Sequence, residues 1–309
     1  MEKVGDVMAE IITFNGTDIT EYVNVKKIVH DMYAGEYPDK IRIEFEDKDN
    51  LWPRWSPQVG DYFSYRNDGT ATGKMYIYDL EYENQKCTLY GCVMPPEMKV
   101  RYTKTWESVY LSQILSEITE GYSHQLNAVT DVFYKHKECN TGKLEFLNTL
   151  GQLESAILVI YDDNIMLVNE QALEAQTSLF ELSCDGAEVS ISDHTADVFD
   201  ACFVQSGEYS GACRIGTGER YYKPNITVPC SSDAEATRYA KAMLRFANKK
   251  KFEIRWKGPI IPELSAGVCI TLVNDDIPAY SGDMYVYHVR HDYNTGTSTI
   301  FMRKPLEGY

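Results

Sequence analysis

The sequence predicts a mainly β protein of the α+β class, in which two related β-modules are joined by a small α/β section. Eight residues at positions 73–80 (GKMYIYDL) return in similar form at positions 282–289 (GDMYVYHV). A glycine-marked strand precedes each copy, at Gly60 and at Gly267, and a third alternating apolar run follows each. The 23 tyrosines favour strands and interfaces, where one end of the ring is buried and the other is wet. A unit repeated at two distant places indicates internal duplication, and duplication favours symmetric assembly over catalysis.

Residues 1–97 are predicted to form the first module. Residues 11–14 lead into Asn15-Gly16, which is a hairpin signal, and the alternation at residues 41–45 is typical of a half-buried strand. After a turn at residues 52–55, we expect the strands listed here: 60–66, 73–83 and 86–93. Short strands separated by Gly, Asn and Asp turns favour a small barrel or sandwich.

Residues 98–190 are predicted to form the α/β connecting section, because the pattern changes after Pro95-Pro96. Apolar residues between positions 106 and 122 fall on one helical face, with Thr105 as the N-cap and Glu107 at the positive end of the helix. The remaining expected elements are a helix at about 143–155, a strand at 156–161, a turn at 162–164 and a strand at 165–168.

Residues 191–309 are predicted to form the second module, interrupted by a helix at 232–248. Ser232 and Glu235 have the spacing of a capping box, and three lysines at 249–251 would lie at the negative end of this helix. Those lysines could also form a phosphate patch. The expected strands are 198–206, 252–257, 267–273, 283–292 and 297–303.

The charge of the chain argues against a protein that grips nucleic acid. There are 46 acidic and 30 basic residues, for a net charge of −16, and no basic face is visible. An acidic surface would instead repel DNA, which suits a channel through which DNA slides. An ordinary solubility charge explains the same numbers. We therefore expect no specific nucleic-acid binding.

The cysteines and the apolar runs place the expected site of synthesis in a reducing cytoplasm. The eight cysteines are scattered without a CxxC pair, so buried thiols are expected. His136 and Cys139 are spaced like half of a zinc site, but no second pair lies nearby, and we expect no metal. Residues 1–10 lack the pattern of a signal peptide, and no run approaches the length that crosses a bilayer. No membrane association is expected.

The sequence offers few candidates for catalysis. The glycines at 211, 216 and 218 lack the GK[ST] ending of a phosphate loop, so a β-turn is expected there. The carboxylate pairs 162–163 and 275–276 could serve a glycosidase, yet Asp is favoured at such turns for backbone reasons. His288 and His291 lie on opposite faces of one strand and cannot act together. We expect no catalytic residue and no cofactor.

The order of these features resembles the late-control-D family of phage tail proteins, the baseplate hubs of contractile tails, which are similar to the amino-terminal part of type VI secretion spike proteins. The resemblance covers nearly the whole chain. It is carried by these stretches: residues 43–52, 59–61, 73–77, 105–122, 232–247, 256–259, 264–267 and 280–291.

The resemblance implies two tail-tube-like β-barrels per chain and a homotrimer whose six barrels form a pseudo-six-fold ring. Such a ring links the hexameric tail tube, or a tube-initiator protein, to the trimeric central spike, and a tape-measure protein could pass through it. The particle would be assembled in the bacterial cytoplasm and would be a virion or a phage-tail-like bacteriocin. No spike repeat or cell-wall enzyme follows the second module in this sequence, so those functions are expected on other chains.

Four tyrosines of the repeated strand are the candidate interface residues: Tyr76, Tyr78, Tyr285 and Tyr287. We expect one face of each strand to fill a barrel core and the other to contact a neighbouring barrel, although all four could be ordinary core aromatics. The alternative to a structural hub is a phage-borne, β-rich protein that acts on carbohydrate or peptidoglycan through one of the aspartate pairs.

Overall fold

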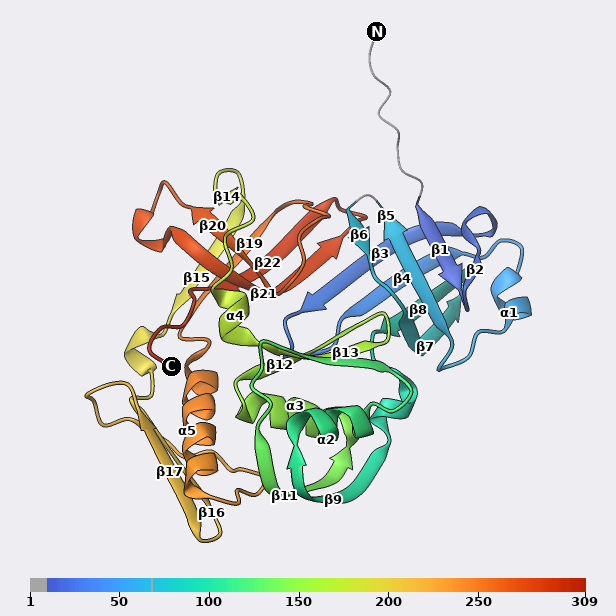
Figure 1. Cartoon of the computed structure of the whole chain (residues 1–309). Helices are drawn as coiled ribbons and strands as arrows, with labels where there is room; N and C mark the ends of the chain where they lie inside the picture. Colours follow the sequence, from blue (N-terminus) through green and yellow to red (C-terminus); the bar gives the residue numbers. More distant parts are fainter. Residues whose placement is uncertain (1–9, 68) are drawn as a thin grey trace.

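A long, curved β-sheet crosses the top of the molecule; Figure 1 shows its early strands in blue to teal and its late strands in yellow to red. The computed structural model describes residues 10–67 and 69–309. The fold is mainly β, as predicted. The early strands are β1 (Ile11–Phe14), β2 (Thr17–Asp18), β3 (Asn24–Tyr33), β4 (Lys40–Glu46), β5 (Tyr62–Asn67), β6 (Thr70–Ala71), β7 (Met75–Glu83) and β8 (Lys86–Cys92). We call β1–β8 the first module.

The other part of this sheet comes from the end of the chain and from two strands that precede residue 194. These strands are β14 (Glu181–Ser183), β15 (Glu188–Asp193), β19 (Phe252–Pro259), β20 (Val268–Val273), β21 (Gly282–Asp292) and β22 (Thr297–Arg303). We call them the second module. Because β14 pairs with β20 and β15 with β19, the sheet of this module takes in residues before the predicted boundary at 190. The division into domains at 1–97, 98–190 and 191–309 stays a prediction.

The two modules repeat one strand order. In the first, neighbouring strands follow the order β3-β4-β8-β7-β5, and in the second they follow β15-β19-β22-β21-β20. Every pair of neighbours in both series is antiparallel. The duplication that eight residues indicated therefore extends over five strands.

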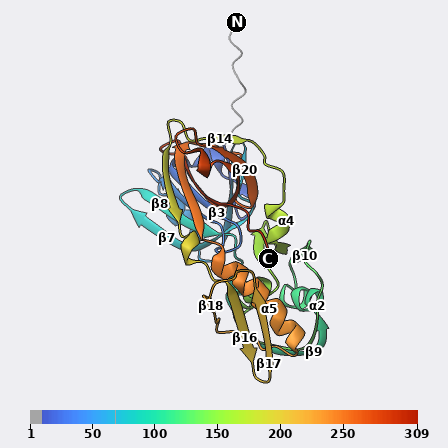
Figure 2. The same ribbon diagram turned by 90° about the vertical axis from the view of Figure 1, so that its left-hand side faces the viewer.

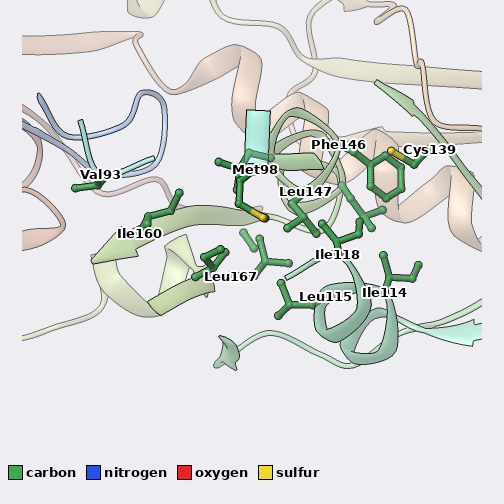
Figure 3. Packing of buried hydrophobic residues seen from close by; sticks show 14 of the residues in the cluster. Val93, Met98, Ile114, Leu115, Ile118, Cys139, Phe146, Leu147, Ile160 and Leu167 are labelled. Atoms are coloured by element: carbon green, nitrogen blue, oxygen red, sulfur yellow. The ribbon is translucent and has the colours of Figure 1, made fainter. Parts of the chain in front are cut away.

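The middle of the chain forms a layer beneath the sheet, drawn in green in Figure 1. Its elements are β9 (Arg101–Tyr110), α2 (Leu111–Ile118), β10 (Ser123–Asn127), β11 (Phe133–Gly142), α3 (Lys143–Leu153), β12 (Ala156–Tyr161), β13 (Asn164–Asn169) and α4 (Glu170–Glu174). Figure 3 shows Ile114 and Ile118 of α2 in one buried apolar cluster with Leu147 of α3 and Leu167 of β13. The predicted second helix and the strands on either side of residues 162–163 are confirmed.

A separate unit of one helix and three strands lies beside this layer. It comprises β16 (Ala201–Ser206), β17 (Tyr209–Arg214), β18 (Tyr221–Tyr222) and α5 (Asp233–Asn248), and Figure 2 shows it below the curved sheet. The Ser232 hydroxyl accepts from the Glu235 amide, as the capping signal predicts, whereas the Glu235 carboxylate accepts from the amide of Ser231. Gly211 lets β17 approach α5 closely, since a Cβ there would meet the backbone of Thr237.

Two local predictions are wrong. The helix expected from residue 106 begins at Leu111, because residues 101–110 form β9 and pair with β11. Its N-cap is Tyr110 in place of Thr105, and Glu107 meets His136 instead of a helix end. The apolar pattern indicates a helix that starts at residue 106, but the nine residue pairs of the β9–β11 ladder outweigh it. The expected turn at 52–55 is a short helix, α1 (Leu51–Trp55).

Candidate functional site: the duplicated strand and the joint between its copies

The repeated strand carries the same irregularity in both copies. Where β7 pairs with β8, the register shifts between Ile77 and Asp79; where β21 pairs with β22, it shifts between Val286 and His288. The extra residue is therefore Tyr78 in the first copy and Tyr287 in the second, and these occupy equivalent positions of the repeat. A β-bulge bends its strand and increases the local twist. Both modules thus curve at the same point.

The four candidate tyrosines occupy different environments. Tyr285 is fully buried in a cluster with Ile157 and Cys269, while Tyr78 is 39% exposed. Tyr76 donates to Asp163, and Tyr287 donates to Glu253, both at 2.6 Å. Tyr285 thus packs within the chain. A role of these tyrosines in contacts between chains stays a prediction.

The modules meet edge to edge in a joint formed by residues 29–33 of β3 and 288–292 of β21, which pair antiparallel. On its outer face, the His288 ring is stacked between Tyr33 and Phe301, with centroids 4.2 and 4.6 Å away. Asp31 accepts from His288 at 3.0 Å and pairs with Arg290 at 3.3 Å. The joint is therefore a continuous part of the sheet with its own aromatic and ionic contacts.

The core face of the joint carries two buried histidines, His30 and His291, directly opposite each other. His291 Nε2 lies 2.9 Å from the Leu264 carbonyl and Nδ1 lies 2.8 Å from the Ser298 hydroxyl, so the neutral ring donates to the first and accepts from the second. Neither nitrogen of His30 has a partner among the described residues. Burial, and then the neighbouring His291, lower the pKa of His30 to about 3.

A buried ion cluster anchors the second module to the helices below it. Glu170 and Glu174 of α4 meet Arg245 of α5 and Arg303 of β22, and Lys249 completes the cluster. Burial alone would raise the pKa of Glu170, but Lys249, Arg303 and Arg245 together hold it below the ordinary value. The lysine run after α5 thus contributes Lys249 to an internal ion pair.

The first module has a smaller and more exposed anchor. Asp163, at the turn between β12 and β13, accepts from Lys74 at 2.5 Å and from Tyr76 at 2.6 Å, and both partners belong to the first copy of the repeat. Asp162 and Asp163 both have positive φ, at 47° and 64°. The turn interpretation of this carboxylate pair is therefore confirmed.

Two other candidates for chemistry, the glycine segment and the pair His136 and Cys139, have structural contacts. Asp200 accepts from the amides of Gly218 and Arg220, so the glycine segment after β17 surrounds a carboxylate of its own chain. His136 bonds Glu107 and Glu138, while Cys139 is buried beside backbone carbonyls. Within residues 10–67 and 69–309, no group of three or more His, Cys, Asp or Glu side chains could hold a metal ion. Nor does that part of the chain contain a helix long and apolar enough to span a bilayer. The predicted absence of a signal peptide falls mostly on residues 1–9, outside the described residues.

Comparison with solved structures places this arrangement among known folds. The 43 kDa tail protein of prophage MuSo2 from Shewanella oneidensis superposes with a TM-score of 0.68 at 12% identity, over 96% of each chain. A tail protein of Neisseria meningitidis MC58 gives a TM-score of 0.71 at 10% identity, over 95% of each chain. The chain has the fold of phage tail proteins.

The same fold extends to a secretion-system protein. A component of the type VI secretion system of E. coli, described as similar to bacteriophage T4 tail proteins, gives a TM-score of 0.64 at 11% identity over 96% of this chain and 78% of its own. No protein-family model and no curated protein matches the sequence. The tail-protein resemblance of the sequence is thus confirmed at the level of the fold.

Sequence reasoning missed β3 and with it the whole joint. The reason lies in a bulge between Val25 and Lys27, where β3 pairs with β4. One extra residue breaks the period of two by which a half-buried strand is recognised. The repeat does not reveal β3 either, because its counterpart β15 is not among the strands that the sequence predicts.

Proposed function

We propose that this chain is a structural hub of a contractile injection particle, in which three copies form a pseudo-six-fold ring between the hexameric tail tube and the trimeric central spike. One observation carries the proposal: each chain contains two copies of one five-strand series, joined edge to edge, in the fold of phage tail proteins. Two equivalent modules per chain turn three-fold into pseudo-six-fold symmetry.

The role is structural and not catalytic. Of the carboxylate pair at 162–163, Asp163 is occupied by Lys74 and Tyr76 of the first module, and the pair sits at a turn. The protein would then be a component of a virion or phage-tail-like particle, with the tube and spike proteins as its partners. The tail-protein fold and the duplication within the chain support these partners.

Native mass measurement and electron microscopy test this proposal. The purified protein, alone or mixed with tube and spike proteins of the same particle, is expected to give a mass of three chains and rings with a central channel. A protein that stays monomeric under both conditions contradicts the proposal. Hydrolysis of peptidoglycan that is lost in Asp163→Asn would favour the enzymatic alternative.

A further inference from the structure

The two copies of the repeated strand differ in how their edges are used. Along one edge β21 pairs with β22. Along the other, its first half pairs with β20 and its second half, from His288 to Asp292, pairs with β3. From Tyr285 to Asp292, β21 therefore has strand neighbours on both sides.

The second half of β7 lacks the corresponding neighbour. Its first half pairs with β5, and the backbone of Ile77 bonds that of Gly60 and Asp61. From Asp79 to Glu83 the same edge has no strand partner among residues 10–67 and 69–309. Tyr82, on this segment, is 45% exposed. An unpaired edge with an exposed aromatic ring is a template for another strand.

The strand that matches β3 also has a free edge. In the second module this position belongs to β15, which pairs with β19 and ends the sheet within the described residues. The registers align the two modules residue by residue. Gly91 and Met302 are equivalent, because each pairs with the residue just before the bulge of the repeated strand. Ile41 pairs with Gly91 and Ile254 pairs with Met302, so these two isoleucines are also equivalent. His30, opposite Ile41, therefore corresponds to Ile191, opposite Ile254.

We propose that β7 of one chain pairs antiparallel with β15 of a second copy of this chain, in the register of the internal joint. Shifting each residue of the joint to its equivalent gives the pairs Asp79 with His194, Leu80 with Asp193, Glu81 with Ser192, Tyr82 with Ile191 and Glu83 with Ser190. The inference deepens the proposed function, on which it rests, by naming the strands that join one chain to the next. Three such contacts, alternating with three internal joints, close a ring of six modules.

Two pairs lie on the core face of this pairing: Tyr82 with Ile191, and Leu80 with Asp193, the equivalents of Val289 and Met32. Tyr82 corresponds to His291 and Ile191 to His30, so an aromatic ring would meet a β-branched residue where the internal joint places two histidines. Ile191 already packs against the core of the second module. Cross-strand aromatic and β-branched pairs are among the favourable ones.

On the outer face, the proposed register keeps carboxylates apart. The carboxylates of Asp79, Glu81 and Glu83 would face His194, Ser192 and Ser190, so none meets another carboxylate directly. A slip of two residues in one direction would place Glu83 opposite Glu188. A slip of one residue would place Ile191 opposite Glu81 or Glu83.

A cysteine pair tests the register in the full chain. In Glu81→Cys with Ser192→Cys, the new thiols lie directly opposite each other across the interface, within reach of a disulfide. Six strands separate β7 from β15 in the sheet order of one chain, so the link can form only between chains. Mild oxidation is expected to give covalent dimers and trimers on non-reducing gels, well above the background of the eight native cysteines.

The matched control is Glu81→Cys with Ser190→Cys, which is off register by two residues and should cross-link several-fold less. Equal cross-linking of both pairs, or none in a protein whose native mass is that of a trimer, would overturn the pairing while leaving the hub proposal intact. A protein that stays monomeric alone and with its tube and spike partners overturns both.

A charge exchange provides the second test. Ser192→Asp places a carboxylate opposite Glu81 and should weaken the trimer at least several-fold in sedimentation measurements. Adding Glu81→Lys should restore assembly. Failure of the second change to rescue the first, with both variants folded by circular dichroism, would count against the pairing.

Discussion

The two copies of the repeated unit share a backbone but fill their cores in opposite ways. In the first copy, Gly91 on β8 leaves space that Phe63 on β5 occupies. At the equivalent places of the second copy, Met302 on β22 is large and Ile270 on β20 is smaller, and both are buried in the same cluster. The first copy thus combines a small residue on β8 with a large one on β5, whereas the second combines a large residue on β22 with a smaller one on β20. What the duplication preserves is strand order and curvature, while side-chain volumes adjust in compensating sets.

The copies also differ in how they are fixed to the layer below. The second is anchored by buried Arg245 and Arg303 with two glutamates, and the first by the partly exposed Lys74 and Tyr76 with one aspartate. The contribution of each anchor to the stability of the fold depends on how deeply it is buried. An unpaired charge is costly in the interior, whereas at the surface water replaces the lost partner.

The largest effect is expected from Glu174→Ala. Glu174 is buried and pairs with Arg245 at 2.5 Å, pairs with Arg303, and accepts from the amide of Leu306 at 3.0 Å. The change leaves two guanidinium groups with less compensation, so the free energy of unfolding should fall by about 3–5 kcal/mol. Urea denaturation measures it. The exposed Glu181→Ala should change the midpoint little, and a loss under about 1 kcal/mol in Glu174→Ala would contradict the comparison.

The next effect concerns the internal joint, which acid should weaken. The pKa of His30 is about 3 in the folded chain, below its ordinary value of 6.5. The folded state therefore favours the neutral ring, and its stabilising contribution is complete above pH 6.5 and is lost as the pH falls toward 3. At pH 4 the loss approaches about 3 kcal/mol, at about 1.4 kcal/mol per pH unit. Thermal unfolding across this range measures it.

His30→Leu should flatten that part of the stability profile, because a neutral side chain replaces a group that must be desolvated when charged. His124→Gln, at an exposed histidine, is the control and should leave the slope unchanged. If the stability of His30→Leu still fell steeply between pH 6.5 and 3, groups other than His30 would be responsible for the acid sensitivity. The proposed joint between chains has no histidine on its core face, so acid should affect it less.

A smaller effect, about 1–3 kcal/mol, is expected from Gly91→Met. A Cβ at this position would lie 2.7 Å from the Phe63 ring, so the added side chain overfills the first core. Adding Phe63→Ile recreates the combination of the second copy and should recover part of the loss. Combining Gly91→Met with Ile270→Phe, in the other module, is the control and should be additive. If the changes in the free energy of unfolding were additive for both double variants, side-chain volumes on neighbouring strands of one module would not compensate for each other.

The sequence was sufficient to predict the elements that depend on local residue patterns. It failed for the elements whose structure depends on pairing with strands that are distant in the sequence. The strands of the repeat, α3 and the Ser232 cap follow from periodicity and capping chemistry. The bulge at Lys26 concealed β3, and β11 converted residues 106–110 from an apparent helix into β9. The ion cluster around Glu174 could not be predicted, because its members are separated by 71 and 129 residues.

The smallest effect is expected at the anchor of the first copy. Asp163→Asn keeps a side chain that tolerates the positive φ of 64° but removes the charge that Lys74 contacts. The Lys74 and Asp163 side chains are 38% and 23% exposed, so water compensates, and the free energy of unfolding should fall by less than about 1 kcal/mol. Urea denaturation beside Glu174→Ala gives the contrast directly. Equal losses in the two variants would mean that both anchors are buried in solution, and that the first module is held to the middle layer as firmly as the second.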